Sequence, residues 1–242
     1  VYGMDESGFP PSNQGTSRVI GRRGTKTQHK QGSANRENVT AIVTICADGT
    51  TLAPTIIFKG HNFMTKWADD NVSHASISHS ENGWTDGEIA AEWIEKDFDR
   101  QTKEKAGGET RVLLMDGHSS HYTPELLTFA KANNIVILGY PPHCTHALQG
   151  LDVVCFAAMK QAWKDEIDKF EAEHKCQIGK EHFAGVFGRA FLTAFTEATV
   201  LAAFEKTGIH PFNPNIITAQ QMKTSLPSSI VGALPLPMPS PV

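Results

Sequence analysis

Three aspartates stand at the edges of stretches whose composition predicts regular structure. Asp5 follows the apolar start of the chain, Asp116 follows the apolar run 111–115, and Asp152 begins a helical stretch. Carboxylates brought together repel one another and raise each other's pKa unless cations lie between them. Mg²⁺ or Mn²⁺ suits such a group, and two ions about 3.5–4 Å apart can activate the attacking oxygen and stabilise the leaving oxygen of a phosphodiester. The trio therefore indicates metal-assisted chemistry at phosphate esters.

Each of these aspartates also has an ordinary structural explanation. Asp5 and Asp116 could be turn residues after strands, because Asp favours such positions. Asp152 could cap its helix by accepting hydrogen bonds from the first backbone N–H groups. Taken one at a time, these explanations stay open.

Histidines flank two of the aspartates. His118-x-x-His121 and His143-x-x-His146, together with Cys144, could be read as a zinc site, but the spacing is permissive. A nucleophile made from Cys144 and His143 is disfavoured because adjacent loop residues rarely face each other. We favour His118 as a residue that hydrogen-bonds the carboxylates, their waters or a phosphate; simple packing remains an equal alternative.

A basic stretch that is studded with Gly, Ser, Thr and Gln runs from residue 18 to residue 36 without any acidic residue. Such a stretch can neutralise phosphates and release counterions, which makes DNA the expected partner. The alternative is a solvated loop that happens to be basic. A small phosphate ester as substrate is less favoured, since it needs no long basic arm. The candidate DNA-binding residues are Arg18, Arg22, Arg23, Lys26, Lys30 and Arg36.

The elements that must position these residues follow from periodicity. Asp48-Gly49 between the β-rich runs 39–45 and 52–58 is a hairpin signal, so the first three strands are expected to form an antiparallel meander. A helix capped by Thr85 or Asp86 comes next. Strand, helix and strand then alternate through residues 111–138. The sequence predicts an α/β fold with a mixed five-stranded sheet flanked by helices.

Composition limits the class of protein. With 242 residues and 40% hydrophobic content, the chain can bury one substantial core, and it contains no apolar run of membrane-spanning length. Four widely spaced cysteines fit buried or incidental thiols in a reducing compartment. We expect an excerpt of a longer protein, with a catalytic domain at 1–217 and an extended Pro-rich tail or linker at 218–242.

Five ordered motifs resemble the DDE superfamily endonuclease domain of pogo, Tigger and jerky transposases and of centromere protein B. They are residues 2–8 (YGMDESG), 33–37 (SANRE), 114–121 (LMDGHSSH), 141–152 (PPHCTHALQGLD) and 208–214 (GIHPFNP).

Asp116 and Asp152 are separated by 35 residues, a spacing typical of the pogo-like group. The resemblance implies an RNase H-like fold, two divalent metals, and Asp5, Asp116 and Asp152 as their ligands. It also implies nicking at transposon ends followed by strand transfer. Two positions depart from the family pattern: Gly150 replaces the usual proline, which is expected to loosen the loop before Asp152, and Cys144 replaces Thr or Ser.

The family's N-terminal DNA-binding modules have no counterpart in this stretch. The leading hypothesis is therefore the catalytic domain of a pogo-like transposase, a nuclear protein that acts on DNA. The alternative is a domesticated relative that keeps the fold as a DNA-binding or dimerising scaffold without catalysis. A homodimer is left open, and no membrane partner is expected.

Overall fold

A computed structural model of the chain describes residues 1–12, 38–117, 122–141, 143–218 and 221. Its centre is a six-stranded mixed sheet with the order β4-β3-β2-β1-β5-β6. The strands are β1 (Tyr2–Phe9), β2 (Val39–Cys46), β3 (Thr55–Lys59), β4 (Ser76–Ser80), β5 (Arg111–Met115) and β6 (Ile135–Gly139).

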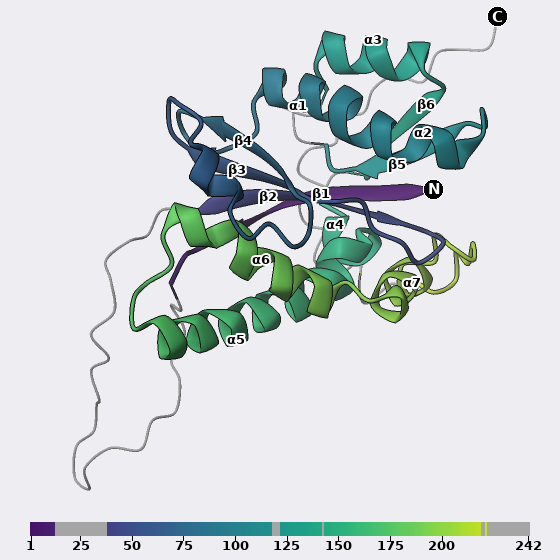
Figure 1. Cartoon of the computed structure of the whole chain (residues 1–242). Helices are drawn as coiled ribbons and strands as arrows, with labels where there is room; N and C mark the ends of the chain where they lie inside the picture. The colour runs from purple at the N-terminus through teal and green to yellow at the C-terminus, as the bar shows by residue number, and fades with distance from the viewer. Residues whose placement is uncertain (13–37, 118–121, 142, 219–220, 222–242) are drawn as a thin grey trace, which may run out of the picture.

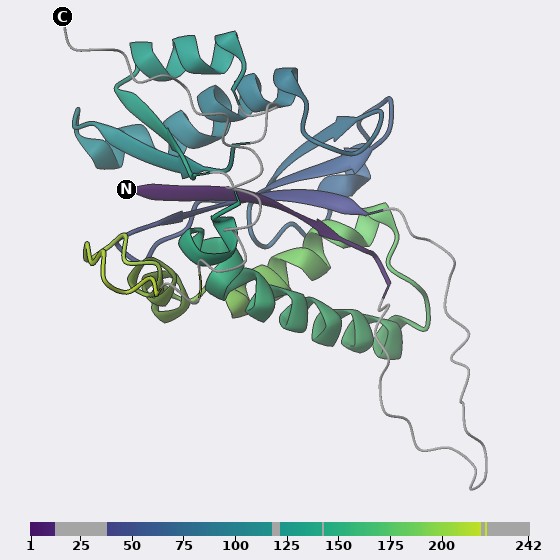
Figure 2. The ribbon, with the colours of Figure 1, turned by 180° about the vertical axis from the view of Figure 1, so that it is seen from behind.

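Helical elements cover both faces of this sheet, as Figures 1 and 2 show from opposite sides. Around one face lie α1 (Gly87–Trp93), η2 (Ile94–Asp99), α2 (Arg100–Ala106) and α3 (Pro124–Ala132). Around the other lie η1 (Thr65–Ala68), α4 (Thr145–Leu148), η4 (Leu151–Cys155), α5 (Phe156–His174), α6 (Lys180–Ala194) and α7 (Glu197–Lys206).

The mixed α/β architecture confirms the expected fold class. β1, β2 and β3 form the antiparallel meander, while β5 and β6 join in parallel beside β1. The sheet has six strands instead of the expected five, because β4 pairs in parallel with β3. The predicted hairpin is present, with Gly49 at a φ of 93°, and Asp86 rather than Thr85 caps α1 by accepting a hydrogen bond from Ile89 N.

Two hydrophobic cores lie on the two faces of the sheet. Alternate residues of β1 serve different cores: Tyr2 and Met4 pack with α1, η2 and α3, whereas Phe9 packs with α5 and α6. This alternation is the period-2 rule for strands. Odd-numbered positions of β1, including Gly3 and Asp5, therefore face the α4–α7 side. The rings of Phe183, Phe187 and Phe191 stack along α6 within the core.

The four cysteines, Cys46, Cys144, Cys155 and Cys176, are free thiols, and all but Cys176 are buried. Within the described ranges, no single helix is long and apolar enough to cross a bilayer. α6 and α7, which meet at a bend of 64°, together have the length and apolar composition of a membrane span. The predicted 218–242 tail lies outside the described residues except for 218 and 221, so that domain boundary stays a prediction.

Candidate active site

Asp5 and Asp116 are brought to the same level of the sheet by the pairing of β1 with β5. These strands are parallel, and Gly3 pairs with Leu114. Asp5 and Asp116 each stand two residues further along, and a shift of two residues keeps a side chain on the same face. The sequence suggested that the first strand ends at Asp5. Instead, β1 continues to Phe9 along β2. Asp5 is 8% exposed in the middle of the sheet, while Asp116 is half-buried directly after β5.

Asp152 reaches the same region from the helical layer. It is the second residue of η4, a short π-helical turn that leads into α5. Leu151 and Cys155 of this turn are buried in the core under the sheet, so Asp152 itself stays at the surface. η4 thus acts as the element that carries the third carboxylate, as the sequence predicted for a helix start.

The three carboxyl groups influence one another electrostatically. The pKa of Asp5 is raised to about 8, first by burial and then by the charge of Asp152, with a smaller contribution from Asp116. The hydrogen bond from Glu6 N to Asp5 Oδ1, at 2.8 Å, opposes that rise. The pKa of Asp152 is also raised, by burial and by Asp116, against the lowering effect of Lys160. Three segments that are distant in the sequence therefore place acidic groups within range of one another's charge.

The donor set at this spot fits a hard divalent cation. A cation between carboxylates that raise each other's pKa stabilises them, and carboxylate oxygen is the ligand that Mg²⁺ and Mn²⁺ prefer. Among the residues that the structure describes, no group of three or more His, Cys, Asp or Glu side chains is arranged so that it could hold a metal ion. The trio is near enough to interact through charge, and its oxygens would have to converge further to share an ion.

A family model and several relatives are similar to this chain. Residues 36–206 match the model of the DDE superfamily endonuclease. The chain belongs to this family. The match includes Asp116 and Asp152 and begins after Asp5, which β1 nevertheless places beside them.

Two curated relatives are much longer than this DDE domain. This chain is 35% identical over 236 residues to the "MFS-type transporter clz9" of Cochliobolus lunatus, and the match covers 95% of this chain and 25% of the relative. It is 25% identical over 130 residues to the "Pogo transposable element with ZNF domain" of Homo sapiens, covering 52% of this chain and 9% of the relative. The domain thus spans a quarter or less of these relatives.

Solved structures of the Mos1 transposase share the fold. The paired-end complex with the left transposon end aligns with a TM-score of 0.50 at 11% identity, covering 89% of this chain and 56% of that one. The mariner paired-end complex with Mn gives a TM-score of 0.50 at 12% identity, covering 87% and 55%. At such low identity the likeness concerns the fold, and it confirms the RNase H-like architecture of the DDE domain.

Other predicted site residues are only partly tested. His118 and the basic residues Arg18, Arg22, Arg23, Lys26, Lys30 and Arg36 lie outside the described residues and stay predictions. The zinc hypothesis gains no support from the described residues His143, Cys144 and His146, since they join no metal-binding group there. His146 Nε2 instead lies 3.0 Å from Gln221 O.

Sequence reasoning missed three residues near the acidic group. Charges of Asp5 and Asp152 act on Tyr140, Asp116 acts on Tyr122, and Lys160 acts on Asp152. Lys160 could have been found from helical spacing, because it lies eight residues after Asp152, about two turns away. Tyr140 and Tyr122 gave no such signal, because their positions depend on strand register and on loop paths.

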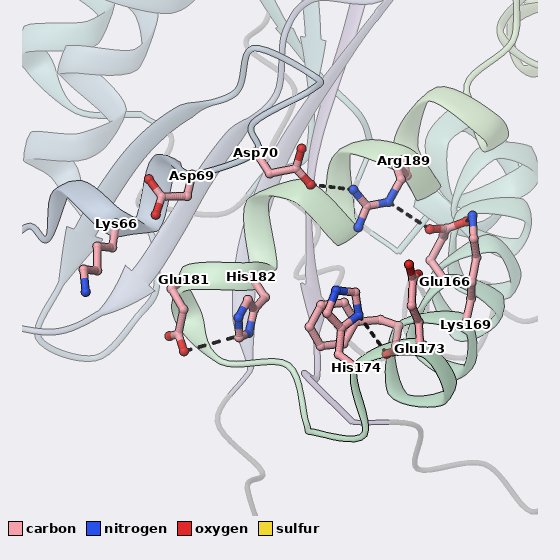
Figure 3. Close-up of a pocket in the computed structure, with 11 residues that line it drawn as sticks. Lys66, Asp69, Asp70, Glu166, Lys169, Glu173, His174, Glu181, His182 and Arg189 are labelled. Carbon is pink, nitrogen blue, oxygen red and sulfur yellow. Dashed lines mark hydrogen bonds and ion pairs between the residues drawn. The ribbon is translucent and has the colours of Figure 1, made fainter.

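A cavity of about 600 Å³ lies far from the aspartates, between η1, the second half of α5 and the start of α6 (Figure 3). Arg189 crosses it and bonds Asp70 at 2.6 Å and Glu166 at 3.1 Å. Glu166 lies fourteen residues beyond Asp152, roughly 21 Å along the helix axis. Carboxylates outnumber cations in its lining and would repel DNA phosphates, so this cavity is not the active site.

Proposed function

We propose that this chain is the metal-dependent nuclease and strand-transfer domain of a pogo-like transposase. It would cut phosphodiesters at transposon ends and join the freed 3′-hydroxyl to target DNA. The observation that supports this most is the mutual charge interaction of Asp5, Asp116 and Asp152 on one side of the sheet. A fold that needed only turn residues and a helix cap would have no reason to bring these three groups together.

The roles of the three aspartates differ with their surroundings. Asp5, buried and with a raised pKa, holds a proton in the metal-free protein near neutral pH and gives it up when a cation binds. Asp116 and Asp152 are more accessible and would hold the ions together with Asp5. Bound Mg²⁺ or Mn²⁺ would supply a polarised attacking oxygen and charge stabilisation for the leaving oxygen.

DNA is the proposed substrate because positive charge is available beside the acidic group. Lys160, exposed on the first turns of α5, already acts on Asp152 and would meet the phosphate backbone there. The predicted basic stretch 18–36 would add sequence-independent affinity. The printed names of relatives support this choice, since one is a pogo transposable element and one structure holds a transposon end.

A second candidate is a domesticated protein that uses this fold as a DNA-binding or dimerising scaffold without catalysis. Retention of all three aspartates favours the enzyme, because a scaffold has no need of a buried carboxyl group with an unfavourable charge environment. Either protein would work in the nucleus, where its DNA lies.

Nicking of a supercoiled plasmid distinguishes the two candidates. The proposed enzyme relaxes the plasmid with Mg²⁺ or Mn²⁺ and not with EDTA, and Asp116→Asn abolishes this while its thermal unfolding stays cooperative. Asp165→Asn, on the exposed face of α5, is the matched control and should nick like the parent. Equal nicking by Asp116→Asn and the parent would remove the catalytic assignment. Absence of nicking by a parent that still binds DNA would favour the scaffold.

A further inference from the structure

Tyr140 lies in line with two of the aspartates across three neighbouring strands. β5 and β6 are parallel, and Met115 pairs with Gly139. The next residues along these strands are Asp116 and Tyr140, and Tyr140 N donates a hydrogen bond to Met115 O at 3.1 Å. Since Asp5 is level with Asp116 on the other side, the row of residues runs from Asp5 through Asp116 to Tyr140.

The hydroxyl of Tyr140, which follows β6, lies close to Gly3 of β1. A Cβ placed on Gly3 would lie 4.0 Å from the hydroxyl oxygen of Tyr140, with Phe204 of α7 at 3.9 Å and Ile45 at 3.7 Å. Gly3 is two residues before Asp5, on the same face of β1. The hydroxyl therefore reaches β1 at Gly3, two residues before Asp5, on the face of the sheet that the α4–α7 helices cover.

The charges of two carboxylates act on this hydroxyl. Burial raises the pKa of Tyr140, and the charges of Asp5 and then Asp152 raise it further. A phenol already keeps its proton at neutral pH, and these neighbours make its loss still less favourable. Tyr140 is thus a neutral hydrogen-bond donor near two carboxyl groups. Once these groups are ionised, they accept hydrogen bonds and cannot donate them.

We propose that Tyr140 is a positioning residue whose hydroxyl donates its one proton to the carboxylate of Asp5 or of Asp152 and turns that group's free oxygen toward a shared divalent cation. This inference rests on the proposed function, because it assigns the tyrosine to the same acidic site. A donor that fixes a metal-binding carboxylate is worth about 10–100-fold in metal affinity in other proteins. Removal of this hydroxyl should therefore weaken cation binding before it affects the fold.

The test measures Mn²⁺ affinity by electron paramagnetic resonance, which needs no catalysis. Tyr140→Phe keeps the ring and removes the hydroxyl, and we expect its affinity for Mn²⁺ to fall about 10-fold. Tyr2→Phe, the same deletion on the opposite face of β1, should bind Mn²⁺ like the parent. The melting temperature of Tyr140→Phe in EDTA should stay close to that of the parent, which a purely structural role would not predict.

A second pair of variants moves the hydroxyl without deleting it. Gly3→Ala places its Cβ in ordinary van der Waals contact with the neighbours of Gly3 and should bind Mn²⁺ normally. Gly3→Val adds γ-methyl groups where the tyrosine ring lies, and should weaken Mn²⁺ binding as Tyr140→Phe does. Combining Gly3→Val with Tyr140→Phe should then cost little more than either change alone, because both remove the same hydrogen bond.

Mn²⁺ affinity of Tyr140→Phe within twofold of the parent would overturn the inference, whether or not the parent nicks DNA. An absence of Mn²⁺ binding by the parent would overturn it as well. A parent that binds Mn²⁺ and loses affinity on Tyr140→Phe, yet cuts no plasmid, would support the inference and remove the proposed nuclease function. The two ideas can therefore fail separately.

Discussion

The carboxylate of Asp152 acts on Asp5 more strongly than the carboxylate of Asp116 does, although Asp116 follows the strand that pairs with β1. The helical layer, rather than the neighbouring strand, therefore supplies the main electrostatic partner of the buried carboxyl group. A cation that stabilises the site must relieve this Asp5–Asp152 repulsion first.

Asp5 should make the metal-free protein less stable as the pH rises. Its carboxyl group ionises near pH 4 in an unfolded chain and at about pH 8 in the folded protein. Between these values the unfolded state holds fewer protons, so the free energy of unfolding falls with rising pH. Each unit by which the folded and unfolded pKa values differ lowers the free energy of unfolding by about 1.4 kcal/mol once the pH has passed both values. Asp5→Asn, which still accepts the Glu6 N–H bond, should therefore gain several kcal/mol at pH 8 and little at pH 4.

Urea unfolding in EDTA at a series of pH values measures this effect. Asp165→Asn is the control and should change stability by less than about 0.5 kcal/mol at every pH. Millimolar Mg²⁺ or Mn²⁺ should raise the melting temperature of the parent, more at pH 8 than at pH 5, and should do so far less in Asp5→Asn. A parent whose stability in EDTA is flat between pH 4 and pH 8 would contradict the burial of a repelled carboxyl group.

Gly150→Ala should disturb the position of Asp152. Gly150 has helical dihedral angles (φ −59°, ψ −31°), and a Cβ on it would lie 2.8 Å from the carbonyl oxygen of Ala203 on α7. Instead of loosening the loop, this glycine lets two backbones approach closely. We expect a loss of about 1–3 kcal/mol in stability from overpacking and at least a 10-fold loss of nicking. Gly8→Ala, whose Cβ would meet Asn38 at 3.5 Å, is the matched control.

Arg111 anchors the start of β5, the strand that delivers Asp116. Its buried guanidinium lies 2.7 Å from Asp99 Oδ1 and donates to Asn133 O at 2.6 Å. Arg111→Ala leaves the buried Asp99 with only its longer 3.6 Å pair to the exposed Lys103 and should cost about 3–5 kcal/mol. Arg100→Ala breaks only a 3.8 Å pair with Asp97 from a side chain that is 71% exposed, and should cost less than about 1 kcal/mol. Equal losses in thermal or urea unfolding would refute this ranking.

Arg22 and Arg23 should contribute to non-specific DNA affinity. Each phosphate contact changes the slope of log K against log salt by about 0.9. The Arg22→Gln/Arg23→Gln double variant should therefore weaken binding and flatten that slope by up to about 1.8. Fluorescence anisotropy on an arbitrary duplex at 50–200 mM salt measures it. An unchanged slope would favour the alternative that residues 18–36 are a basic solvated loop without a role in DNA binding.

Much of the fold could be predicted because its core elements carry strong periodic signals. β2, β5, β6 and the aromatic helix α6 follow such patterns. β4 (Ser-Ile-Ser-His-Ser) was missed because an edge strand with polar residues on both sides of a single Ile lacks an apolar run. β1 was cut short at Asp5 because Asp-Glu-Ser-Gly is typical of a turn, whereas eight pairs with β2 keep it extended.

The site was predictable where local sequence marks it. Asp5, Asp116 and Asp152 stand in recognisable motifs, and a helix start at Asp152 followed from its loop. The role of Tyr140 could not be inferred, because it depends on the register of β1, β5 and β6 and on the missing side chain of Gly3, both long-range properties. The tight contact of Gly150 with Ala203 likewise depends on how α7 packs.

Anomalous diffraction from crystals grown with Mn²⁺ at pH 8 tests the central claim most directly. The account predicts anomalous peaks between the side chains of Asp5, Asp116 and Asp152, with oxygen distances typical of bound Mn²⁺, and their loss in Asp116→Asn. Well-ordered carboxylates from all three residues with no peak among them at saturating Mn²⁺ would contradict it.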